Sequence, residues 1–152
     1  MSSDRPSPDL WGLLLAASGA FSIANGVWML LDPGHWYEHL PAGVPDTGPL
    51  NAHFVRDIGC AFVAVGAALV AAWRRPAWRA PLTATAAAFF VMHALLHVHD
   101  TARGLLEADH WWLDAPGVYA PALLLAYAAH RFNTRPHDPR PTGAGVQEGS
   151  PK

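Results

Sequence analysis

Residues 58–73 read IGCAFVAVGAALVAAW, and Cys60 carries the one polar side chain among them. The stretch is apolar on every side, whereas a surface helix of a soluble bundle keeps a polar face. Ala, Leu, Val and Phe dominate it, which favours a helix over the alternating pattern of a barrel strand. The stretch therefore predicts the body of a helix that crosses a membrane.

Three further apolar blocks accompany this one, so that the expected helices cover residues 10–31, 50–73, 81–99 and 111–132. A helix rises about 1.5 Å per residue, so each block can cross a hydrocarbon core about 30 Å thick. The expected fold is all-α, a four-helix transmembrane bundle over residues 9–132. A soluble four-helix bundle is the structural alternative. Residues 1–8 and 133–152 are rich in Pro and polar residues and are predicted to be disordered tails.

Basic residues set the expected orientation, because cytoplasmic connections carry an excess of Lys and Arg. The connection between the second and third blocks contains Arg74, Arg75 and Arg79, and more basic residues follow the fourth block. Residues 32–50 contain no Lys or Arg, and residues 99–110 contain one Arg. The bundle is therefore predicted to be N-in and C-in, a multi-pass protein of the cell inner (plasma) membrane.

Tryptophan and glycine positions fit this prediction. The seven Trp residues lie near block ends, where an amphipathic ring suits the membrane interface. Glycines recur at intervals of seven residues in the first two blocks, so that each set lines one helix face and permits close packing: Gly12, Gly19 and Gly26, then Gly59 and Gly66.

Composition excludes several function classes. The formal net charge is −2, which gives no overall basic field for nucleic acid. A single cysteine, Cys60, forms neither an internal disulfide nor a dithiol redox pair. Phosphate-binding glycine loops, HExxH and a serine nucleophile elbow are missing from the sequence. The expected partners are the lipid bilayer and either a second copy of the chain or another membrane protein.

Polar residues inside the blocks gather at one depth, in the outer half of the membrane. The expected topology places there Asn25, His53, Arg56, Asp57, His93, His97 and Tyr119. Ionisable groups within a span are costly and often functional. His53 and Asp57 share one helix face because they are four residues apart, and His93 and His97 do so as well.

Facing pairs on antiparallel neighbours would bring three imidazoles and a carboxylate together. That set, His53, Asp57, His93 and His97, suits a divalent transition metal such as zinc, copper or iron. Asn25, Arg56 and Tyr119 would then contact a bound cofactor. A haem, a quinone or a proton-transfer role is the less favoured chemistry. The competing interpretation is a purely structural network, with Arg56 and Asp57 as an ion pair.

Two short motifs suggest a resemblance. The stretch HFVRDIG (residues 53–59), an apolar helix, a basic turn and then HALLH (residues 93–97) resemble a group of small, largely uncharacterised four-span bacterial membrane proteins, broadly DoxX-like. The resemblance covers roughly residues 10–132. It implies a four-helix inner-membrane protein with a respiratory or redox association and no established activity. Cys60 stands alone where some members of such families use cysteine pairs, which argues against thiol chemistry.

Three functions follow as hypotheses, and enzymatic activity stays open. The first is a metal or redox-cofactor site in the outer half of the bundle. The second is a membrane accessory or interaction protein whose polar cluster is structural. The third is a small transporter, although no polar residues continue into the inner half to complete a path.

Overall fold

A computed structural model describes residues 9–134, and all of the regular elements in that range are helical. The longer helices are α1 (Leu10–Leu31), α3 (Ala52–Arg74), α4 (Arg79–Ala102) and α6 (Ala120–Thr134). Short elements join them: α2 (Pro33–His39), α5 (His110–Leu113), the 3-10 turns η1 (Val44–Thr47) and η2 (Pro76–Trp78), and the π turn η3 (Ala115–Tyr119).

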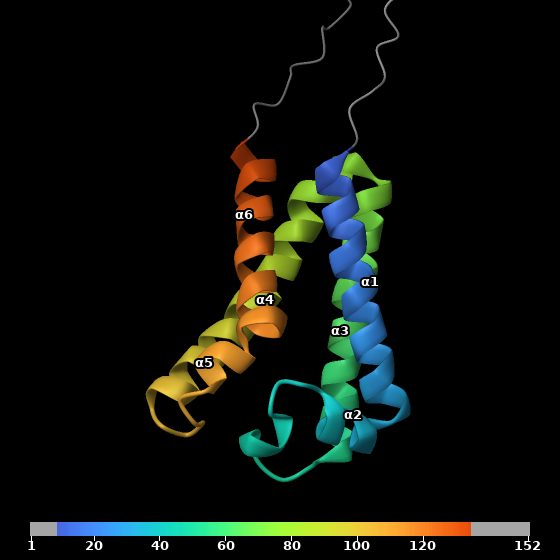
Figure 1. Cartoon of the computed structure of the whole chain (residues 1–152). Coiled ribbons are helices and arrows are strands. Elements are labelled where there is room, and N and C mark those ends of the chain that lie inside the picture. Colours follow the sequence, from blue (N-terminus) through green and yellow to red (C-terminus); the bar gives the residue numbers. More distant parts are fainter. Residues whose placement is uncertain (1–8, 135–152) are drawn as a thin grey trace, which may run out of the picture.

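Successive long helices run in opposite directions, so residues 9 and 134 lie at the same end (Figure 1). We call this end, with the turn at residues 74–79, the terminal end, and the opposite end the loop end. The first loop begins with the short helix α2, which starts where Asp32 accepts a hydrogen bond from the backbone of His35, at 3.1 Å. The predicted disordered tails lie outside the described residues, apart from the last two residues of α6.

The fourth expected helix, residues 111–132, differs most from its prediction. It is divided at Asp114 into α5, η3 and α6, and α6 alone contains 15 residues. Pro116, two residues after Asp114, has no backbone N–H to donate. The chain instead forms a π turn, in which Tyr119 N donates to Asp114 O at 3.2 Å. A bundle of four transmembrane helices is thus not established.

Within residues 9–134, three helices are long and apolar enough to cross a membrane: Leu10–Leu31, Ala52–Arg74 and Pro76–Ala102. Large apolar side chains are exposed along them, such as Phe21, Met92 and Leu95 at 60% exposure or more. Water would penalise such surfaces and lipid does not. The protein is therefore compatible with a membrane environment.

Helices α1 and α3 form the tightest pair in the fold. A Cβ atom added to Gly26 would lie 2.6 Å from the carbonyl oxygen of Gly59, and one added to Gly19 would lie 2.8 Å from that of Gly66. Only glycine permits this backbone approach. The glycine faces expected from the seven-residue spacing thus meet. Gly12 instead lies beside Asp9 and Arg79.

All four long helices converge toward the terminal end. The apolar core there contains Leu15 of α1, Leu69 of α3, Phe90 of α4 and Leu125 of α6. Arg79 fastens this end, because it pairs with Asp9 and donates from Nε to the carbonyl of Ala72 at 3.3 Å. The same aspartate caps α1 by accepting from Gly12 N at 2.9 Å.

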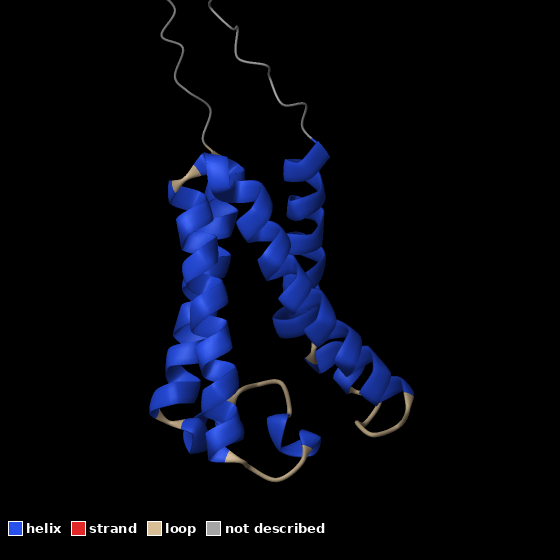
Figure 2. Cartoon of the chain, turned by 180° about the vertical axis from the view of Figure 1, so that it is seen from behind, coloured by secondary structure: helices blue, strands red, loops and turns tan. Residues whose placement is uncertain are grey.

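Toward the loop end, α4 diverges from the α1–α3 pair and continues to α5 (Figures 1 and 2). The segment 40–51, which contains η1, lies at this end between the α1–α3 pair and the helices α4 and α5. The fold therefore consists of a glycine-packed α1–α3 pair and an α4–α6 arm. The apolar core joins them at the terminal end, and the first loop lies between them at the loop end.

Candidate functional site

A fully buried carboxylate marks the loop end of the α4–α6 arm. Asp114 has a side-chain exposure of 0% and lies at the division between α5 and η3. Its backbone carbonyl accepts from both Val118 N, at 2.8 Å, and Tyr119 N, at 3.2 Å. The π turn thus holds the residue in place, and its carboxylate requires polar partners because a buried charge is costly when unpaired.

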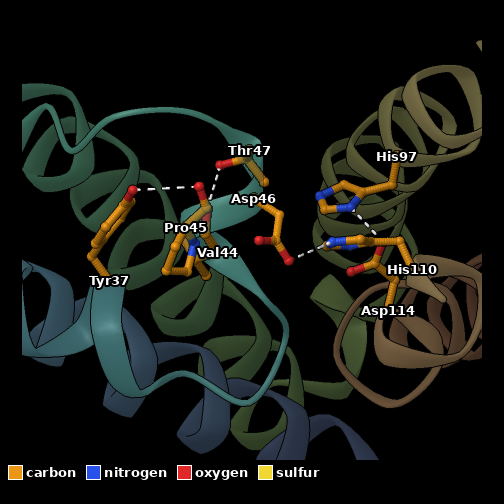
Figure 3. Close-up of polar contacts among 8 residues, drawn as sticks. All are labelled: Tyr37, Val44, Pro45, Asp46, Thr47, His97, His110 and Asp114. Carbon is orange, nitrogen blue, oxygen red and sulfur yellow. Dashed lines mark hydrogen bonds and ion pairs between the residues drawn. The ribbon is translucent and has the colours of Figure 1, made fainter. Parts of the chain in front are cut away.

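Two imidazoles from different helices supply those partners (Figure 3). His97 of α4 places Nδ1 2.8 Å from Asp114 Oδ2, and its side chain is 18% exposed. His110 of α5 is fully buried and places Nδ1 3.5 Å from the same oxygen. The first distance is that of a charge-assisted hydrogen bond, whereas the second is a longer electrostatic contact.

A carboxylate from the first loop completes the group. Asp46 Oδ2 lies 3.4 Å from His110 Nε2, and the Asp46 side chain is 55% exposed (Figure 3). Gly43 makes this approach possible, since it adopts φ +60 and a Cβ there would lie 3.2 Å from the His110 ring. We call Asp46, His110, Asp114 and His97 the His–Asp cluster. It reaches from the surface to a buried carboxylate.

Unsatisfied polar atoms surround the cluster. Asp114 Oδ1 is buried and has no hydrogen-bond partner among the described residues, and the same is true of the hydroxyls of Thr101 and Tyr119. The Tyr119 hydroxyl lies near both Asp114 and Thr101. Buried polar atoms without partners are uncommon and mark places where a proton, a water or a ligand group is accommodated.

His93 adjoins the cluster one turn of α4 nearer the terminal end. Its ring centroid is 4.7 Å from that of His97, in an edge-to-face arrangement. On its other sides it stacks on Phe89, at 6.3 Å, and meets Phe62 of α3 edge-on, at 6.2 Å. Expected site residues His93, His97 and Tyr119 therefore do lie in one region.

His53 and Asp57, expected in the same metal site, lie elsewhere. They contact each other at 3.4 Å on α3, with side-chain exposures of 89% and 60%. Among residues 9–134, no group of three or more His, Cys, Asp or Glu side chains is arranged to hold a metal ion. The expected convergence of His53 and Asp57 with the α4 histidines is not formed. His93 instead meets Phe62 of α3, and His97 pairs with Asp114.

Arg56 and Asn25, expected to contact a cofactor, have structural contacts instead. Arg56 donates from Nε to the carbonyl of Leu30 at 3.3 Å, near the end of α1. Asn25 accepts from Trp36 Nε1 at 2.9 Å, which fastens α2 to α1. The expected pairing of Arg56 with Asp57 does not appear among the ion pairs of the described region.

Sequence reasoning missed the centre of the cluster. Neither His110 nor Asp114 is among the site residues predicted from the sequence. A signal existed, because His110 and Asp114 are four residues apart, as His53 and Asp57 are. An acidic residue inside an apolar block, beside Pro116 and Gly117, was the second signal.

Comparison with known proteins gives a family and no activity. A family model described as a domain of unknown function, DUF4345, matches residues 11–99. The chain belongs to the DUF4345 family. No curated protein and no solved structure matches it. The DUF4345 match covers α1 to most of α4, including His97, and ends before His110 and Asp114. It confirms an uncharacterised family, and nothing in these comparisons supports the DoxX-like resemblance.

Proposed function

We propose that this DUF4345 protein spans the inner membrane with both termini in the cytoplasm, and that its His–Asp cluster exchanges protons between the outer solution and the membrane interior. The observation that carries the proposal is the buried Asp114 carboxylate, which lies 2.8 Å from His97 and 3.5 Å from His110. His110 in turn contacts the half-exposed Asp46. Acceptors and donors thus alternate from the surface inward.

The chemistry of each group suits this role. A proton that reaches Asp46 can pass to Nε2 of His110, and the same ring can release its other proton from Nδ1 to Asp114 Oδ2. Asp114 then hands a proton to Nδ1 of His97. Imidazole performs such steps because its two nitrogens bind and release protons in the pH range of cells. His93, next to His97, is the first group beyond the cluster.

His110 is the point at which the path opens or closes. The two long distances of the cluster, 3.4 Å and 3.5 Å, both involve its ring, whereas the His97–Asp114 contact is short. Small displacements of that ring toward Asp46 or Asp114 would bring either contact into hydrogen-bond range. Proton exchange with the surface is therefore controlled by His110 and by the loop segment that covers it.

The membrane placement rests on three apolar helices and on charge asymmetry. Arg74, Arg75 and Arg79 lie at the terminal end. The first loop contains acidic residues and no Lys or Arg. The segment from α5 to α6 supplies the fourth crossing in this proposal, which places residues 9 and 134 on one side. Reporter fusions after residues 47 and 134 test it, with a periplasm-dependent signal expected only at residue 47.

A second candidate is a purely structural role in an accessory protein, in which the cluster holds the first loop against α5. We call this role the structural clasp. It is favoured by the contacts that anchor the first loop, such as the bond from the Tyr37 hydroxyl to the carbonyl of Gly48 at 2.7 Å. Under this alternative, Asp46 and His110 hold the loop against α5 and exchange no protons inward. The two candidates differ in whether His97 and His110 titrate together.

The decisive experiment is nuclear magnetic resonance of the full chain in lipid nanodiscs, with nitrogen-15 in the histidine rings. The proton-exchange proposal predicts that the His97 and His110 signals change over the same pH steps. In Asp114→Asn, the two signals should change independently of each other. In Asp46→Asn, the pH response of the His110 signal should change more than that of His97. Asp57→Asn is the matched control and should affect His53 alone. Independent titration of His97 and His110, unchanged in Asp114→Asn, would leave the clasp as the function.

A further inference from the structure

An open groove with a volume of about 500 Å³ lies at the terminal end, far from the His–Asp cluster. Its walls are apolar and come from Ile23 of α1 and from Ala67, Val70 and Ala71 of α3. Small side chains form much of the α3 wall. A helix advances about 1.5 Å per residue, so the groove extends roughly 10 Å along α3 from its rim.

Cationic and aromatic side chains form the rim. Arg74, Arg75 and Trp78 line the groove where α3 ends and η2 begins. The guanidinium of Arg75 lies 4.4 Å from the centre of the Trp78 ring, and that of Arg74 lies 5.6 Å from the centre of the Trp73 ring. Such contacts hold the cations at the level of the aromatic rings, which favour the membrane interface.

The charge of these two arginines is not balanced by the described part of the protein. Arg79, the third arginine of the turn, pairs with Asp9. No carboxylate within residues 9–134 forms an ion pair with Arg74 or Arg75. Two exposed guanidinium groups at the mouth of an apolar groove match a ligand that has an anionic head and an apolar tail.

We propose that this groove binds an anionic phospholipid of the leaflet at the terminal end. The phosphate group lies between Arg74 and Arg75, and an acyl chain lies against Ala67, Val70 and Ala71. Basic sites between membrane helices recognise acidic headgroups by this combination. The proposal uses the membrane placement proposed above and is independent of the His–Asp cluster.

Lipid retention in native mass spectrometry tests the proposal. The full chain, purified in mild detergent, is mixed with equal amounts of phosphatidylglycerol and phosphatidylcholine, and the bound lipid is measured. The wild-type chain should retain phosphatidylglycerol preferentially. An arginine near an anionic surface contributes about fivefold in affinity, so Arg74→Gln with Arg75→Gln should lower retention by roughly 25-fold. Arg103→Gln, at the loop end, is the matched control and should change nothing.

The tail of the ligand is tested separately from its charge. Ala67→Phe fills the groove, whereas Ala88→Phe places the same ring at an exposed site on α4. Only Ala67→Phe should reduce retention, and millimolar inorganic phosphate should not displace the lipid. Equal retention of both lipids, or identical behaviour of the two phenylalanine variants, would overturn the proposal. So would a dimer that dissociates in Ala67→Phe with lipid retention unchanged, because a second copy would then occupy the groove.

Failure of the lipid site is distinguishable from failure of the proposed function. The histidine titrations depend on Asp46, His110 and Asp114, none of which lies near the groove. Reporter fusions test membrane placement independently of both. A correctly oriented, proton-exchanging protein without lipid preference would contradict the groove proposal alone.

Discussion

The α1–α3 pair and the loop end of the α4–α6 arm are stabilised by different contacts. In the pair, backbones approach so closely at Gly26 and Gly59 that a Cβ would lie 2.6 Å from a carbonyl oxygen. At the loop end of the arm, His110 and Asp114 are fully buried and Asp114 pairs with the partly buried His97. The pair shows that helices of this fold can pack closely without any ionisable group. The arm nevertheless buries a carboxylate and an imidazole, at a cost in desolvation free energy. That difference directs attention to function in the arm.

The largest effect is expected from breaking the glycine pair. Gly26→Val introduces atoms where the Gly59 carbonyl lies, and neither backbone can yield without separating the helices. We expect a loss of about 3 kcal/mol in the free energy of unfolding, as overpacked sites show. Denaturant titration in detergent measures it. Gly117→Ala is the control, since nothing lies within 4 Å of its Cβ, and a loss of similar size there would refute the argument.

A smaller loss is expected from neutralising the centre of the arm. Asp114→Asn keeps the shape of the side chain and removes its charge-assisted bond to His97. Hydrogen bonds to charged groups contribute about 2 kcal/mol, and the variant should be destabilised by that amount. The same denaturant titration applies. Asp100→Asn, which loses a bond to the exposed His99, should lower the free energy of unfolding far less. Equal losses in the two variants would contradict the argument that the burial of Asp114 strengthens its bond.

The smallest effect is expected on the exposed face of α3. His53 and Asp57 form a pair of the same spacing as His110 and Asp114, but with exposures of 89% and 60%. His53→Gln should change stability by less than about 0.5 kcal/mol, because solvent screens such pairs. Thermal unfolding in nanodiscs would show it. A large shift would indicate that a membrane partner covers this face.

Much of the architecture could be predicted from the sequence because local patterns determine it. The apolar block at residues 10–31 coincides with the bounds of α1, and the breaker at Asp32 and Pro33 ends that helix. The seven-residue spacing of Gly19 and Gly26 identified the face that packs on α3. Helix signals of this kind depend only on neighbouring residues.

The site could be predicted only in part, because it depends on distant contacts. The arrangement at the loop end depends on the direction that α4 takes away from the α1–α3 pair, which no local pattern specifies. The contact of Asp46 with His110 spans 64 residues and requires the positive φ of Gly43. His97 was identified because its spacing from His93 is local, whereas its partner Asp114 lies across a turn.

The central claim is that His97, Asp114 and His110 act as one unit, and a mutant cycle in two backgrounds tests it most directly. His97 and His110 both contact Asp114 Oδ2, so their energies should couple through that carboxylate. We predict that the stability effects of His97→Gln and His110→Gln deviate from additivity by about 1 kcal/mol in the wild-type background and become additive in Asp114→Asn. Additive effects in the wild-type background would contradict the account.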